Sequence, residues 1–410
     1  MARRKVKKKI IRKIICLLLI GVIALAGYEG YKHFDNKESI KDSPINNVFN
    51  NKNSKEPKEK VPEEYKISLL ATGDGLIHSV IYRSYDKGNG VYDFTDALKY
   101  VKDIVKKYDI AYYNQETPTG DASIAYSGYP MFYTPSAYVD AMKDAGFNTV
   151  SLASNHSLDK GEKGILNTVK YFKGTNLLYN GMSDSEDNRN NFIIKEKNNI
   201  TYTMLSYTTL TNGLQVPSGK SYLLNLYDKE QVKKDIEAVR DKVDILIVAM
   251  HWGVEYQNTP NKEQTEIADY LSSLGVDIII GNHPHILQPI TKINNTIVMY
   301  SLGNFISNQY GGSNGDWNKL IGFMTTLDIT KTVNPDNSSK IEISNLGGEL
   351  IFTKYTGNPT TTAVHYDHTV IPFSMMNDDR YLKDYRRLYE KYSNVLTSMG
   401  TELNIAPYLK

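Results

Sequence analysis

The sequence predicts a layered α/β domain with a largely parallel sheet. From Lys66 onward, short apolar runs rich in β-favouring residues alternate with segments of helical periodicity, and this alternation is typical of βα units. Several of the apolar runs end abruptly, so that Asp, Asn or His follows a buried strand directly. Hydrophobic residues make up 40% of the 410 residues, a balance that is typical of a chain with a sizeable core.

The first residues are strongly basic and precede an apolar run. Lysine and arginine crowd residues 1–13, although the net charge of the whole chain is only +2. The run from Ile14 to Tyr28, extended back through Ile10, approaches the roughly 20 residues that span a bilayer. Because positive residues stay inside, we expect a cytoplasmic basic segment at 1–13, a single transmembrane anchor at 10–28, and an extracellular C-terminal domain. A cleaved signal peptide is the alternative, since Ala24-Leu25-Ala26 resembles a cleavage site.

A polar segment follows this run. Residues 29–64 are rich in Asn, Lys, Glu, Ser and Pro, and we expect a flexible linker there. The basic cluster could instead be a nucleic-acid arm, but its place before an apolar run favours a topology signal, and we expect no nucleic-acid partner. Cys16 is the one cysteine of the chain, so no disulfide can form within it.

The domain is expected at residues 65–375. Five strands are expected at 66–72, 109–113, 148–153, 243–250 and 276–280, and helices at 95–107, 136–146, 160–174, 228–242 and 261–275. Asn198-Asn199 and Asn294-Asn295 favour hairpin turns, and the later short β-like runs predict antiparallel strands. Residues 376–410 should form a helical tail, whose stripe of Tyr and Leu favours packing on the domain over binding a partner.

Each of the five expected strands ends in residues that commonly bind metals. In order they are Asp74; Asn114 and Glu116; Asn155, His156 and Asp159; His251 and Glu255; and His283 and His285. Carboxylate, amide oxygen and imidazole together suit divalent Zn, Mn or Fe. A bridging carboxylate could hold two such ions about 3.5–4 Å apart.

Each residue also has a purely structural interpretation. Asp74 could cap a helix, Asn155-His156 could be a satisfied turn, and His251 could pack beneath Trp252. The sequence favours an N-cap role for Asp159, which precedes an expected helix, and Glu255 could pair with a local base. The common position of all these residues at strand ends favours a metal site.

Six motifs resemble the bacterial poly-γ-glutamate capsule-synthesis family, whose CapA-type domain is related to calcineurin-like metallophosphoesterases. In order they are GDGLIHS from Gly73, NQETP from Asn114, SNHSLDKG from Ser154, HWGVEY from His251, GNHPH from Gly281 and YSLGNF from Tyr300. The resemblance covers roughly residues 66–305. It implies a sandwich of two β-sheets flanked by helices, an external domain behind an anchor, other capsule-synthesis membrane subunits as partners, and an anionic polymer as substrate.

The resemblance also implies roles for single residues. Asp74 and His285 would bind a first metal ion and Glu116 would bridge to a second. The second ion would be held by Asn155, His251 and His283, and His156 would donate a proton to a leaving group. Leu76 stands where metallophosphoesterases usually have a histidine, which puts the first metal site in doubt.

Two loops rich in Tyr and Gly could contact a polymer, and Tyr133 and Tyr310 are their candidate substrate-binding residues. Packing within the loops is the alternative. Two functions therefore stay open: a metal-dependent phosphoesterase or hydrolase, and a non-catalytic subunit of a polymer synthesis and export complex.

Overall fold

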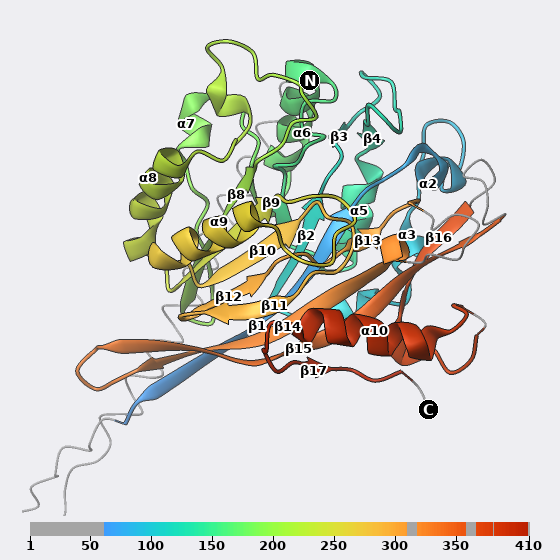
Figure 1. Cartoon of the computed structure of the whole chain (residues 1–410). Coiled ribbons are helices and arrows are strands. Elements are labelled where there is room, and N and C mark those ends of the chain that lie inside the picture. The colour runs from blue at the N-terminus through green and yellow to red at the C-terminus, as the bar shows by residue number, and fades with distance from the viewer. Residues whose placement is uncertain (1–60, 310–317, 358–365, 380, 409–410) are drawn as a thin grey trace, which may run out of the picture. The chain divides into compact units, whose positions relative to one another are not determined.

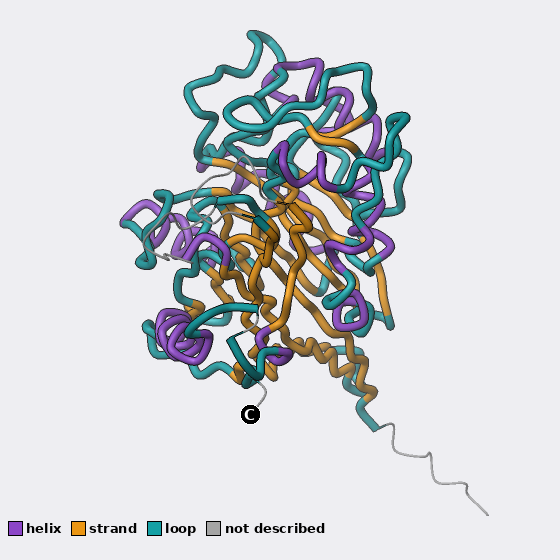
Figure 2. The backbone as a smooth tube through the Cα atoms, turned by 90° about the vertical axis from the view of Figure 1, so that its right-hand side faces the viewer, coloured by secondary structure: helices purple, strands orange, loops and turns teal. Residues whose placement is uncertain are grey.

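Two β-sheets stack face to face, and helices cover their outer faces (Figure 1, Figure 2). The computed structural model describes residues 61–309, 318–357, 366–379 and 381–408. Its architecture confirms the predicted α/β class and the sandwich of two sheets. The predicted basic segment, anchor and most of the linker lie outside the described residues. Within the described ranges, no helix combines the length and apolar content needed to cross a membrane.

The first sheet has the strand order β16-β15-β14-β1-β2-β5-β6, with β13 paired to β1 and β17 to β15. Strands β1, β2, β5 and β6 run parallel, whereas β14, β15 and β16 are antiparallel. The early parallel and late antiparallel character predicted from the sequence is thus found within one sheet. The strands are β1 (Glu63–Gly75), β2 (Ile110–Gln115), β5 (Thr149–Ser151), β6 (Leu178–Asn180), β13 (Asn304–Ile306), β14 (Ile321–Val333), β15 (Ser339–Thr356), β16 (Tyr366–Pro372) and β17 (Asn404–Ile405).

The second sheet has the order β11-β12-β10-β9-β8-β7. Asn198 and Asn199 have φ angles of 47° and 58°, and Asn294 has a φ of 53°. Asparagine tolerates this left-handed region, so both predicted hairpins form at these residues. The strands are β7 (Lys195–Lys197), β8 (Ile200–Thr208), β9 (Ile245–His251), β10 (Ile278–Asn282), β11 (Ile290–Ile293) and β12 (Thr296–Met299); β3 (Thr119–Gly120) and β4 (Thr134–Pro135) form a separate pair.

Because side chains alternate between the two faces of each strand, the buried side chains form three layers. Leu69 of β1 and Ile247 of β9 belong to the cluster between the sheets. Leu70 faces the helices outside the first sheet, and Val248 those outside the second. Since neighbouring side chains on a strand point to opposite faces, these uninterrupted apolar runs can serve two cores at once.

The helices mostly match the predicted ranges. The expected helix at 95–107 is wrong as one element, because it splits into α3 (Thr95–Leu98) and α4 (Lys102–Val105). The tail helix α10 (Tyr385–Thr397) buries Tyr385, Leu388, Tyr392 and Leu396 in the cluster that lies between the sheets. The remaining helices are α2 (Ser79–Ser84), α5 (Ala137–Asp144), α6 (Gly161–Lys173), α7 (Glu186–Arg189), α8 (Lys229–Val239) and α9 (Lys262–Ser273).

A close backbone approach fixes the end of β1. A Cβ atom on Gly73 would lie 1.8 Å from the carbonyl oxygen of Gly303, and that same oxygen accepts a hydrogen bond from the Asp74 amide. We expect Gly73→Ala to lower the free energy of unfolding by about 3 kcal/mol, because a backbone carbonyl cannot move aside easily. Chemical denaturation would measure this. Gly174→Ala, whose nearest contact would be 3.3 Å, is the matched control, and equal losses in both variants would contradict the prediction.

Candidate metal centre

The carboxyl ends of four parallel strands meet at one edge of the sandwich. In the first sheet, Asp74 at the end of β1 pairs in register with Asn114 of β2. In the second sheet, His251 at the end of β9 pairs with Asn282 of β10. A hydrogen bond joins the two sheets here: the His283 amide, just after β10, donates to Asp74 Oδ2 of β1 at 3.2 Å. Ligands of an α/β protein are expected at such an edge.

Asp74, Glu116 and His285 form the first group of possible metal ligands. Each offers one atom, and these atoms lie within 4.8 Å of one another. His285 Nε2 is 3.5 Å from Glu116 Oε1, and His285 Nδ1 is 3.3 Å from Asp74 Oδ2. Asn114 donates to Asp74 Oδ1 at 2.9 Å and thereby orients this carboxylate.

Glu116 is buried without a hydrogen bond to either carboxylate oxygen within the described part of the chain. Burial is the main cause that raises the pKa of Glu116 well above its usual value, against the nearby His285. A buried carboxylate without hydrogen bonds is costly unless it is neutralised or binds a cation.

The pKa of His285 is raised as well, but by a different cause. Burial alone would lower the pKa of His285, but the carboxylates of Glu116, Asp74 and Glu255 outweigh burial and raise it to about 9. Its Nδ1 also lies 3.0 Å from Asn304 Oδ1. His285 has a φ of 59°, which a non-glycine residue adopts only in a special loop conformation.

A second group of possible metal ligands shares His285 with the first group. Glu255, His283 and His285 again offer atoms within 4.8 Å of one another. His283 is buried, has a φ of 97°, and keeps a ring nitrogen, Nδ1, without a hydrogen bond among the described residues. Burial lowers the pKa of His283 to about 4, so the ring is neutral and can donate an electron pair.

His251 lies beside His283, and Asn155 lies beside His251. His251 Nε2 lies 3.0 Å from Asn155 Oδ1, and the His251 and His283 ring centroids are 4.9 Å apart. Burial lowers the pKa of His251 well below its usual value. The structure therefore brings all six predicted metal ligands together. Glu255, which the sequence left undecided, lies with them.

His156 is not among these groups of ligands, and its partner is Asp159. Its Nδ1 lies 2.8 Å from Asp159 Oδ2, and the same oxygen accepts a hydrogen bond from the Phe132 amide at 2.7 Å. The Phe132 ring packs against His156 with centroids 4.7 Å apart. The predicted N-cap role of Asp159 is wrong, because Lys160 is the N-cap of α6. Asp159 turns inward instead and fixes the imidazole.

A cavity of about 490 Å³ opens onto this centre. Its lining includes His285, Asn155, His156, Glu255, Leu76 and His78. His78 Nδ1 is engaged by the backbone at Leu76 and Asn308, and burial lowers the pKa of His78 to about 4.

The two predicted substrate-binding residues are Tyr133 and Tyr310. Tyr133 is fully buried and its hydroxyl donates to the Asp121 carbonyl, so the structure does not bring it to this cavity. Tyr129 and Met131 of the same loop line the cavity instead. Tyr310 lies outside the described residues.

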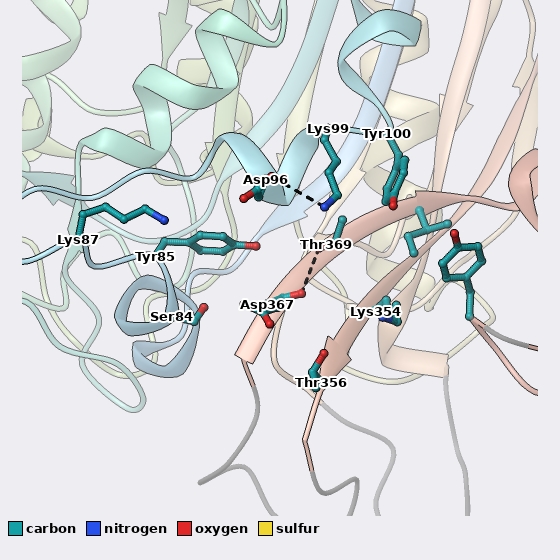
Figure 3. Close-up of a pocket in the computed structure, with 12 residues that line it drawn as sticks. Ser84, Tyr85, Lys87, Asp96, Lys99, Tyr100, Lys354, Thr356, Asp367 and Thr369 are labelled. Carbon is teal, nitrogen blue, oxygen red and sulfur yellow. Dashed lines mark hydrogen bonds and ion pairs between the residues drawn. The ribbon is translucent and has the colours of Figure 1, made fainter.

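A second cavity, of about 390 Å³, begins at the other end of α2. Ser84 and Tyr85 line it, together with Lys87, Lys99 and Lys354 (Figure 3). Asp96 faces Lys99 at 3.8 Å. The residues that line this cavity include no histidine, so its chemistry differs from that of the metal centre.

Two residues that position the site were not singled out from the sequence. Asn304 holds His285, and Phe132 packs on His156. Asn304 lies inside the YSLGNF motif, and this was a usable signal. Nothing in the local sequence of Phe132 points to its contact.

The donor set fits a divalent metal. The centre combines a carboxylate and a neutral imidazole nitrogen that have no hydrogen bond among the described residues with an amide oxygen, all buried. Such groups stabilise a folded protein poorly by themselves but are suitable ligands for Zn, Mn or Fe.

Comparisons with known proteins agree with the motifs. A family model described as bacterial capsule synthesis protein PGA_cap matches residues 68–309. The PGA biosynthesis protein CapA of Bacillus subtilis (strain 168) is 35% identical over 173 residues, which are 42% of this chain and 45% of that protein. The capsule biosynthesis protein CapA of Bacillus anthracis is 33% identical over 175 residues, or 42% and 43% of the two chains. The alignments thus span less than half the length of these relatives.

The crystal structure of a hypothetical protein from Thermus thermophilus covers 68% of this chain and 99% of its own, with 14% identity and a TM-score of 0.38. That overlap is too loose to establish a common fold. The family match, by contrast, spans more than half of the chain and includes every predicted metal ligand. The chain therefore belongs to the bacterial capsule synthesis protein family PGA_cap.

Proposed function

We propose that the chain acts in the synthesis or export of a capsule polymer through a metal-dependent hydrolase site. One observation carries the proposal: Glu116 is fully buried between Asp74 and His285, and among the described residues neither carboxylate oxygen has a hydrogen bond, Oε1 facing His285 Nε2 at 3.5 Å. The names of the Bacillus relatives support the capsule role. The relation of the family to calcineurin-like metallophosphoesterases supports the hydrolase chemistry.

The proposed ligands divide into two sets. Asp74, Glu116 and His285 would hold one ion, and Asn155, His251 and His283 a second, with Glu116 shared and Glu255 close to both. Divalent ions held by these residues would supply an activated water and would polarise a phosphoryl or carbonyl group.

The chain's own residues supply the proton. Asp159 accepts the Nδ1 proton of His156, which leaves Nε2 for the cavity. A proton held at Nε2 can pass to a leaving oxygen or nitrogen. Metal analysis of the purified protein, with a screen of phosphoester and γ-glutamyl substrates, tests the proposal; a metal-free protein without turnover would refute it.

A second candidate is a non-catalytic subunit of a polymer synthesis and export complex. Leu76 favours it, because this buried leucine stands where metallophosphoesterases usually place a metal-binding histidine. In that case the centre would hold metal to grip polymer carboxylates. Metal binding without turnover, together with loss of polymer export in a metal-free variant, would select this candidate.

We further propose that residues 10–28 anchor the protein in the cell membrane with the C-terminal domain outside. The basic residues before the apolar run support this orientation. Protease added to intact cells should remove the domain beyond Lys32. Protection of the domain, while a known external protein is digested, would show that the proposed topology is wrong. Other membrane subunits of capsule synthesis are the proposed partners.

A further inference from the structure

Two carboxylates face the same ring nitrogen in the metal centre. His285 Nε2 lies 3.5 Å from Glu116 Oε1 and 4.0 Å from Glu255 Oε1. These distances are too long for strong hydrogen bonds, but two atoms that each bind one ion at about 2.0–2.2 Å lie about 3–4 Å apart. We propose that Glu255 is a ligand of the first metal ion, together with Glu116 and His285. This inference rests on the proposed metal-dependent function.

Glu255 would replace the ligand that is missing at Leu76. The Leu76 side chain is 2% exposed and lines the same cavity as Glu255 and His285. An aliphatic side chain offers no electron pair to an ion, so the first metal position lacks the histidine that metallophosphoesterases usually have there. Glu255 lines this cavity from a different loop, the one after β9, and its carboxylate would restore the number of ligands.

Asn304 determines which nitrogen of His285 faces the two carboxylates. The Asn304 Nδ2 donates to the Lys319 carbonyl at 2.7 Å, and because a carbonyl can only accept, the orientation of the amide is fixed. The Asn304 Oδ1 therefore faces His285 Nδ1 at 3.0 Å and accepts its proton. In the neutral ring, the electron pair is then on Nε2, the atom beside Glu116 and Glu255.

Asp74 has little remaining capacity to bind this ion. Its Oδ1 accepts a hydrogen bond from Asn114 at 2.9 Å, and its Oδ2 accepts one from the His283 amide at 3.2 Å and lies 3.3 Å from His285 Nδ1. A carboxylate has about four acceptor positions, so protein donors occupy most of those on Asp74. A further carboxylate beside Glu116 would balance the charge of a divalent ion.

The loop that carries Glu255 is fixed against the GNHPH loop. The Trp252 amide donates to the Asn282 carbonyl at 3.1 Å, and the Tyr256 amide donates to the Pro284 carbonyl at 2.9 Å. These two hydrogen bonds lie on either side of Glu255 in the sequence. Because the backbone is already held, ion binding has to order only the torsions of the Glu255 side chain, which is 40% exposed.

Metal titration of the full-length protein in detergent tests this ligand. The protein is freed of metal by chelation and titrated with Mn²⁺ alone. Calorimetry measures the affinities, and electron paramagnetic resonance distinguishes a coupled pair of ions from a lone ion. Glu255→Gln should bind one of the two ions about 10–100-fold more weakly, because even groups that only contact a metal ligand commonly contribute that much. The signal of a lone ion should then replace that of the pair.

Two further variants separate a ligand from a structural residue. Glu263→Gln is the matched control, because Glu263 is exposed on α9 and is not among the grouped ligands; it should bind both ions as the wild type does. Leu76→His, introduced into Glu255→Gln, should recover the weakened ion, because it returns an imidazole to the position implied by the resemblance. A purely structural role of Glu255 would not permit this rescue.

The outcomes distinguish this inference from the proposed function. Two ions bound by Glu255→Gln with the affinities of the wild type would overturn the assignment of Glu255 and leave the hydrolase proposal standing. A wild type that binds two ions but turns over no substrate would refute the hydrolase, and the titration would still decide the role of Glu255. A wild type that binds no Mn²⁺ would overturn both.

Discussion

His156→Gln should lower turnover by about 10²–10⁴-fold, which is the usual contribution of general acid catalysis. The domain should keep its fold and its metal, because His156 bonds to Asp159 and is not among the grouped ligands. Glutamine keeps a polar group of similar length but cannot deliver a proton at neutral pH. Turnover on the substrate found by screening, or capsule yield in cells carrying this single change, measures the effect.

Asp159→Asn separates positioning from proton transfer. An asparagine amide in place of the carboxylate can donate to His156 Nδ1 and so hold the ring in the wrong tautomer, so the variant should lose activity although His156 is still present. Elemental analysis and far-UV circular dichroism provide the controls. Capsule yield at the wild-type level in His156→Gln, with metal retained, would lead us to the non-catalytic subunit.

Loss of a ligand from the metal centre should have the second large effect. His251→Ala and Glu116→Gln should each lose bound metal by elemental analysis while keeping their far-UV circular dichroism. For the wild type, a metal present at about 100 times its dissociation constant adds about 2.7 kcal/mol to the free energy of unfolding. That increment should vanish in both variants.

The metal-free proteins provide a sharper comparison. In the wild type without metal, neither Glu116 carboxylate oxygen has a hydrogen bond among the described residues and Oε1 faces His285 Nε2 at 3.5 Å, so Glu116→Gln should change stability under chelating conditions only through this one contact. Glu349→Gln is the matched control, because this carboxylate accepts a hydrogen bond from the Ser374 amide at 2.8 Å and lies outside the centre. It should lose the same stability with and without metal. A metal-induced gain in Glu116→Gln equal to that of the wild type would contradict the assignment.

The polar residues at the ends of the buried strands were predictable from the sequence, because an apolar run marks each strand and the polar residue that follows it marks the end of the strand. Asp74, Glu116, His251 and His283 each follow an apolar run closely, and parallel strands bring their carboxyl ends to one edge. The asparagine hairpins were also predictable, since Asn198 and Asn199 tolerate positive φ angles locally. Both inferences need only short-range information.

Features that depend on distant partners were not predictable. Asp159 looks like an N-cap in sequence, but Phe132, which is 27 residues away, gives its carboxylate an inward partner. Tyr133 and Tyr129 belong to one aromatic loop, and only the fold decides which ring is buried and which is exposed. The break between α3 and α4 has no signal in the sequence, because the apolar spacing there continues without interruption.

The long strand β1 has a mechanical consequence. It is bonded antiparallel to β14 from the pair Glu63 and Val333 to the pair Ala71 and Thr325, and on its other side it pairs with β2. A pull on the chain ahead of Glu63 would act along the strand, so these hydrogen bonds would bear the force together, in shear, and not one at a time. Asp74 sits at the far end of the loaded strand. The metal-binding residues should therefore keep their positions under a tension that would separate a hairpin one hydrogen bond at a time.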